Sequence, residues 1–68
     1  VFVRGPENLH EGLVNIRIFD LSGKLFFSDQ YEASNEVYEL NYELISGVYL
    51  VQFSNHKINQ NKKLVVRQ

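Results

Sequence analysis

The sequence predicts an all-β domain, either a small sandwich or a small barrel. Residues 47–53 (GVYLVQF) form the most apolar run, which is rich in β-branched and aromatic side chains and opens with a glycine. Residues 20–23 (DLSG) are a strong turn signal between two runs of strand type. Similar turn signals divide the chain into about six or seven short strands, a spacing typical of these two architectures.

Length and charge restrict the class of protein further. The chain has 68 residues and no cysteine, so we expect one domain whose core is not supplemented by disulfides. Seven basic and eight acidic residues give a net charge of -1, which argues against a nucleic-acid partner because such a partner usually demands a basic face. We expect a single domain over residues 1–68, trimmed at its N-terminal edge because the chain begins with Val1 and a short apolar run.

The first half of the chain predicts a short strand and a hairpin. Residues 1–3 are apolar and predict the end of a strand, which a glycine and a proline then stop. Residues 13–19 alternate between apolar and polar side chains, as a strand with one buried face does. Residues 24–28 form the second arm of an antiparallel hairpin, closed by the DLSG turn. The polar residues 29–36 predict the end of that strand and a loop.

Residues 36–45 fit two structures. Val37, Leu40 and Leu44 have helical spacing, and Gly47 would follow the end of such a helix as its cap. In the other structure, residues 37–40 form a strand and a turn leads on to the next strand. We favour the strand, because a helix of about ten residues is marginal by itself and the surrounding pattern is β.

The second half of the chain predicts two longer strands. Residues 47–53 are apolar at nearly every position, so we expect a strand in the middle of a sheet and buried on both faces. Gly47 would release the chain from the preceding turn. Residues 54–61 suit a hairpin loop with a short extra strand near residues 57–58, and residues 62–67 form the last strand.

No group of residues indicates catalysis or a cofactor. His10 and His56 lie in predicted loops without a partner at metal-ligand spacing. Glu39 and Glu43 would share one face of a helix, yet a solvated face explains them better than a catalytic carboxylate pair, which also needs a substrate cleft. No serine lies in a nucleophile-elbow motif. We therefore predict no enzyme, no metal, no cofactor and no small-molecule substrate.

Three segments together resemble a known family. They are residues 18–24 (IFDLSGK), 44–51 (LISGVYLV) and 62–66 (KKLVV). In this order and spacing they are similar to the type A C-terminal sorting domain of proteins exported by the type IX (Por) secretion system of Bacteroidetes. The resemblance covers residues 13–68, with Ile45 where the family commonly has proline or a small residue.

The resemblance implies a fold and a role in export. The fold would be an immunoglobulin-like antiparallel β-sandwich at the end of a larger cargo protein, with Asp20, Gly23, Gly47 and Tyr49 as structural motif residues. The outer-membrane machinery would recognise the domain in the periplasm. A sortase-like peptidase would then remove it and leave the cargo at the cell surface or outside the cell.

The last strand is the candidate for recognition by that machinery. An edge strand offers unpaired backbone groups to an added strand, and the basic side chains provide a charged rim. The candidate residues are Lys62, Lys63, Leu64, Val65, Val66 and Arg67. In the competing interpretation, Leu64 and Val66 only close the core.

A rival function is a non-catalytic accessory module, either a carbohydrate-binding domain or a spacer in an adhesin. Its support is a set of aromatic side chains that could stack on sugars, although such residues more often pack in the core. They are Tyr31, Tyr38, Tyr42 and Tyr49.

Overall fold

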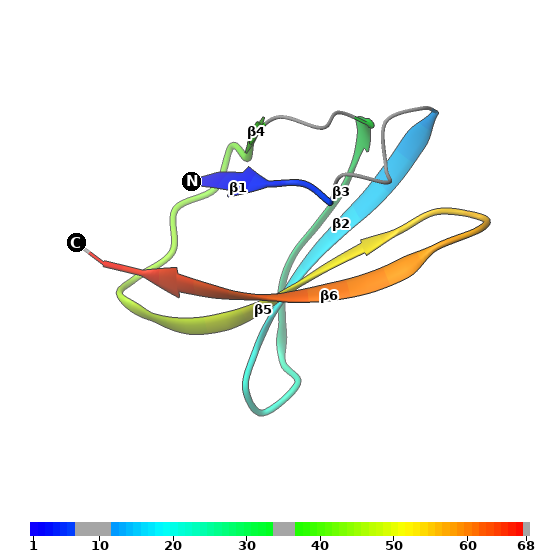
Figure 1. Ribbon diagram of the computed structural model, residues 1–68. Coiled ribbons are helices and arrows are strands. Elements are labelled where there is room, and N and C mark those ends of the chain that lie inside the picture. The colour runs from blue at the N-terminus through cyan, green and yellow to red at the C-terminus, as the bar shows by residue number, and fades with distance from the viewer. Residues whose placement is uncertain (7–11, 34–36, 68) are drawn as a thin grey trace.

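The computed structural model describes residues 1–6, 12–33 and 37–67, which contain six β-strands and no helix (Figure 1). The strands are β1 (Phe2–Arg4), β2 (Leu13–Asp20), β3 (Leu25–Glu32), β4 (Val37–Glu39), β5 (Gly47–Ser54) and β6 (Asn59–Val66). The four longer strands form one antiparallel sheet in the order β3-β2-β5-β6, and β1 pairs with β4 in a second antiparallel sheet. The predicted all-β fold, a small immunoglobulin-like sandwich, is confirmed.

The core lies between the two sheets. Alternate side chains of β2 and β5 are buried beneath the second sheet. Figure 1 shows β1 and β4 over one face of the larger sheet. The second layer adds side chains from β1, from β4 and from the segment that follows β4. The buried residues are Val14, Ile16 and Ile18 of β2, Tyr49, Val51 and Phe53 of β5, and Val3, Tyr38, Leu40 and Leu44 of the second layer.

Strand β5 is central, as predicted, because it pairs with both β2 and β6. The expectation that both its faces are buried is wrong. Val51 is 1% exposed, whereas Val48 and Leu50 on the opposite face are 36% and 39% exposed. The second sheet covers one face only, and none of the described residues forms a layer on the other. We call these the inner face and the outer face.

Strand β3 is longer than the sequence predicts, since residues 29–32 continue the strand and are not a loop. They pair with β2 in register, for example Gln30 with Asn15. β3 is an edge strand whose polar side chains remain in solvent, so their polarity does not stop the pairing. Residues 34–36, the rest of the predicted loop, lie outside the described residues.

A β-bulge in β3 brings two aromatic side chains to the core. Ile18 pairs with Phe27 and Phe19 pairs with Leu25, which leaves Phe26 as the extra residue. Phe26 and Phe27 both pack against the buried cluster. The rings of Phe27 and Tyr42 lie 5.5 Å apart, so the bulge also ties β3 to the segment after β4.

The choice of a strand over a helix near residue 37 is confirmed, because Val37–Glu39 is β4.

The loop predicted for residues 54–61 is wrong: β5 extends to Ser54, β6 begins at Asn59, and no extra strand forms at residues 57–58. A shorter turn closes this hairpin, with the side-chain oxygen Oδ1 of Asn55 accepting hydrogen bonds from the backbone N–H groups of Lys57 (2.8 Å) and Ile58 (2.7 Å).

Candidate functional site

The three sequence segments that carry the family resemblance lie side by side on neighbouring strands. Phe19 of β2 pairs with Leu50 of β5, which in turn pairs with Lys63 of β6. The next row joins Asp20, Tyr49 and Leu64 in the same way. Segments far apart in the sequence therefore form one end of the larger sheet.

The turn after β2 is organised by the carboxylate of Asp20. Its Oδ1 atom accepts hydrogen bonds from Ser22 N (2.9 Å), Ser22 Oγ (2.7 Å) and Lys24 N (2.9 Å). The hydrogen bond from the Ser22 hydroxyl, followed by that from the Lys24 backbone, holds the pKa of Asp20 below its usual value. Gly23 has φ of 94°, a conformation that favours glycine, so both predicted motif residues of this turn have a structural role.

Tyr49 anchors the other end of the motif. Its ring is buried and meets the ring of Phe26 edge-on, with centroids 5.8 Å apart. A Cβ atom on Gly47 would lie 3.5 Å from this ring, and the φ of Gly47 is not positive. Gly47 is the first residue of β5 and lies next to the Tyr49 ring, where an added Cβ would make an ordinary contact. The release of the chain from the preceding turn by Gly47 stays a prediction.

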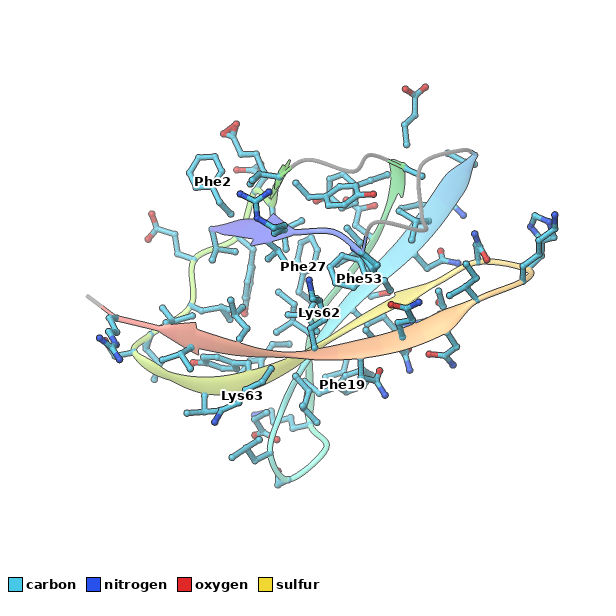
Figure 2. The ribbon with its side chains drawn as sticks, in the orientation of Figure 1. Phe2, Phe19, Phe27, Phe53, Lys62 and Lys63 are labelled. Atoms are coloured by element: carbon cyan, nitrogen blue, oxygen red, sulfur yellow. The ribbon has the colours of Figure 1, made fainter. Side chains whose placement is uncertain are left out.

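The candidate recognition residues of β6 do not share one surface, because strand alternation divides them. Lys62, Leu64 and Val66 belong to the inner face: Leu64 and Val66 pack against the core, and Lys62 Nζ donates a hydrogen bond of 3.4 Å to Arg4 O. Lys63 and Val65 belong to the outer face and are exposed. Figure 2 shows Lys62 on the side of β1, and Lys63 on the opposite side together with Phe19.

A family model for the secretion system C-terminal sorting domain matches residues 5–67. The chain belongs to this family. The sorting-domain family carries the C-terminal signal for type IX secretion, which directs proteins toward the cell surface or the extracellular space. Comparison with curated proteins and with solved structures gives no match.

The sorting domain contains no group of three or more His, Cys, Asp or Glu side chains that could hold a metal, within the residues that the structure describes. His10 lies outside those residues, and His56 is exposed in the turn between β5 and β6. Glu39 lies on β4, so Glu39 and Glu43 do not share a helix face. An open hollow of about 290 Å³ is lined by Glu43 with Val1, Leu44 and Val66.

The tyrosines do not form a sugar-stacking surface, because they take part in internal packing. Tyr38 and Tyr49 are buried, and Tyr31 contacts Tyr38 with ring centroids 6.0 Å apart. Tyr38 in turn lies 5.9 Å from Phe53. Burial, followed by the nearby charge of Asp29, raises the pKa of Tyr31. These rings are part of the core of the sorting domain.

Sequence reasoning missed the exposed apolar side chains of the outer face. For Val48 and Leu50 the reason is that the run at residues 47–53 is apolar at nearly every position, which predicts burial on both faces. The signal that was present lies in the neighbouring strand: Asn15 and Arg17 alternate with buried residues of β2, which indicates that this face meets solvent. Within residues 1–6, 12–33 and 37–67, no helix is long and apolar enough to span a membrane.

Proposed function

We propose that residues 1–68 act as one sorting domain, covalently joined to a larger cargo protein, and direct that cargo through the type IX secretion system across the outer membrane. The family match over residues 5–67 carries this proposal. On this route the outer-membrane machinery recognises the domain in the periplasm. A sortase-like peptidase then removes it, and the cargo stays at the cell surface or is released.

The structure supports β6 as the element that the machinery contacts. β6 is an edge strand whose one partner among the described strands is β5, so its free edge offers backbone donors and acceptors to an added strand. Lys63 and Arg67 are exposed and give this edge a basic rim. The inward side chains Leu64 and Val66 contribute to packing. On this proposal, recognition falls to the exposed residues of β6, while its inward residues close the core.

The export role is tested with a fusion. A reporter with a signal peptide for the inner membrane is joined to residues 1–68 and expressed in a type IX-competent bacterium and in a strain without the outer-membrane translocon. We expect the reporter at the cell surface and in the medium in the first strain, and in the periplasm in the second. Equal release from both strains would refute the proposed route. A reporter without the domain is the control.

The role of β6 is tested with variants that keep its packing residues. Deleting residues 63–68 removes Leu64 and Val66, so that truncation affects folding as well as recognition. A chain that stops after Val66, and the variant Lys63→Ala, leave both packing side chains in place. Reduced export with an unchanged unfolding temperature would support recognition through β6. Export equal to that of the matched control Lys57→Ala, in the turn before β6, would count against it.

A further inference from the structure

The outer face of the larger sheet carries a contiguous apolar patch. Phe19 pairs with Leu25 on one side and with Leu50 on the other. Val48 pairs with Val65, two residues further along β5 and β6 on the same face. Cross-strand neighbours on one face lie about 4.5–5.5 Å apart at Cβ, so these five side chains adjoin one another. Leu25, Val48, Leu50 and Val65 are 48%, 36%, 39% and 49% exposed. We call these five residues the outer patch.

Apart from Leu13 at the far end of β2, which is 57% exposed, the rest of the outer face is polar and bonded within itself. Arg17 donates a hydrogen bond of 3.2 Å to the side-chain oxygen of Gln52. In the following row, Gln30 donates one of 3.3 Å to the side-chain oxygen of Asn15. The outer patch is therefore confined to the end of the sheet where the three family segments meet. A sheet face left to solvent for its whole length would be expected to carry single apolar side chains such as Leu13, not five adjoining ones.

The charges around the outer patch are of one sign. Lys63 pairs with Leu50 across the strands, and Arg17 lies one row away from Phe19 on the same face. The carboxylates of the described residues do not lie on this part of the outer face. Asp20 ends β2 in register with the inward Tyr49, and its carboxylate bonds to the turn. The others are in register with an inward residue (Asp29), at the opposite end of the face (Glu32), or on β4 and the segment after it (Glu39 and Glu43). An apolar surface with cationic neighbours is complementary to an apolar surface with carboxylates.

We propose that the outer patch is a docking surface for a protein whose apolar centre covers it and whose carboxylates lie opposite Lys63 and Arg17. The inference rests on the proposed export function and makes this protein a component of the type IX machinery. A sheet face of this kind packs against a second sheet at a spacing of about 10 Å, with Val48, Leu50 and Val65 interdigitating with its side chains. The side chains of β6 that take part are the outward ones, Lys63 and Val65.

A second copy of the chain is a poor occupant. If two outer patches met directly, Lys63 and Arg17 of each copy would come close to the same cations of the other, and like charges at an interface are costly. If the copies shifted so that Lys63 approached Glu32, each outer patch would cover the polar half of its partner. Neither arrangement gives both apolar contact and charge pairing.

A lipid surface fits less well than a protein. Peripheral membrane binding needs a cluster of basic side chains, each worth about 1 kcal/mol near an anionic surface, together with apolar groups that insert among the lipids. Within its strands the outer face offers two cations near the patch, and the chain as a whole has a net charge of -1. The patch side chains also lie within strands and not at a protruding tip.

The test uses the reporter fusion in the type IX-competent strain. The patch variant combines Val48→Thr, Leu50→Thr and Val65→Thr, because threonine keeps the strand preference and removes apolar contact. We expect its export to fall roughly tenfold, with the reporter retained in the periplasm. The charge variant Lys63→Glu should lower export similarly. It keeps the test decisive if the patch variant fails to fold.

Matched controls lie on the same face and in the nearby turn. Ser28→Thr, Gln30→Thr and Asn59→Thr place three threonines in the polar half of the outer face, and Lys57→Glu reverses a charge away from it. Both controls should be exported like the parent fusion, and thermal unfolding of each purified fusion confirms that it is folded. Export of folded patch and charge variants at the parent level would overturn the inference.

Two further outcomes assign the patch to other occupants and would also overturn it. One is binding of the fusion to phosphatidylglycerol vesicles that the patch variant loses. The other is a dimer in sedimentation that the patch variant converts to a monomer.

Failure of the parent fusion itself to be exported would refute the proposed function. Parent export together with normal export of the variants would leave that function intact and refute only the docking surface.

Discussion

The phenolic hydroxyl of Tyr49 donates a hydrogen bond of 2.7 Å to the backbone carbonyl oxygen of Ile45, four residues earlier. Tyr49 is buried in β5, whereas the side chain of Ile45, in the segment that leads into this strand, is exposed. The bond therefore fixes an irregular segment to the central strand. A tyrosine that bonds back to the chain a few residues upstream is also a feature of immunoglobulin-type sandwiches.

Replacing this hydroxyl tests how much the bond stabilises the domain. Tyr49→Phe keeps the edge-on contact with Phe26 and removes the bond to Ile45. We expect the free energy of unfolding to fall by about 1 kcal/mol, measured by urea denaturation. Tyr42→Phe, at a partly exposed ring, is the control. Equal effects of the two changes would show that the bond to Ile45 contributes little.

The two glycines of the family segments should respond differently to alanine. Gly23 has φ of 94°, so Gly23→Ala forces a side chain into a strained conformation and should cost about 1–3 kcal/mol. Gly47 has no positive φ, and an added Cβ would meet the ring of Tyr49 at 3.5 Å, an ordinary contact. Gly47→Ala should change stability by less than about 1 kcal/mol. Thermal unfolding of both variants measures the two losses of stability. A larger loss for Gly47→Ala than for Gly23→Ala would contradict this prediction.

Local chemistry allowed the hairpin and the central strand to be predicted from sequence. The Asp20 turn depends on bonds within five residues, and the alternation of β2 is visible directly in the chain. The strand at residues 37–39 was correctly preferred to a helix. The length of β3 was missed, because Asp29 and Gln30 are held by register with β2 and not by their own propensity.

The outer patch could not be predicted, because burial of a strand depends on what covers each face. Val48 and Val51 have the same side chain in the same run, yet only Val51 faces the second sheet. The division of β6 has the same origin. Lys62 and Lys63 are neighbours in sequence, and alternation places them on opposite faces (Figure 2).

The turn after β2 should make stability depend on pH in the acid range. The hydrogen bonds that the Asp20 carboxylate accepts lower its pKa in the folded state, so the folded state binds its proton more weakly than the unfolded chain does. The stabilisation is present above the unfolded pKa of about 3.9 and is lost as the pH falls through the lower, folded value. NMR titration measures the pKa of the Asp20 carboxyl group in the folded state, and acid unfolding measures the loss of stability at low pH.

Ser22→Ala provides the matched test of that origin. It removes the hydroxyl donor to Asp20 and leaves the two backbone donors in place. The pKa of Asp20 should rise toward its ordinary value, and the loss of stability should begin at a higher pH than in the parent domain. An unchanged titration of Asp20 would show that the serine hydroxyl does not stabilise the carboxylate.

One-sided burial of β5 predicts a contrast between two valines in the same strand. Val51 is 1% exposed, so Val51→Ala should cost about 2 kcal/mol, from the transfer of two methyl groups and the cavity they leave. Val48 is 36% exposed on the outer face, and Val48→Ala should cost less than about 1 kcal/mol. Urea denaturation of the isolated chain measures both.

A large cost at Val48 would mean that a further layer covers the outer face of the free domain, which would remove the outer patch as a surface for any partner. A small cost at Val48 combined with lost export in the patch variant separates contacts made on folding from contacts made on docking.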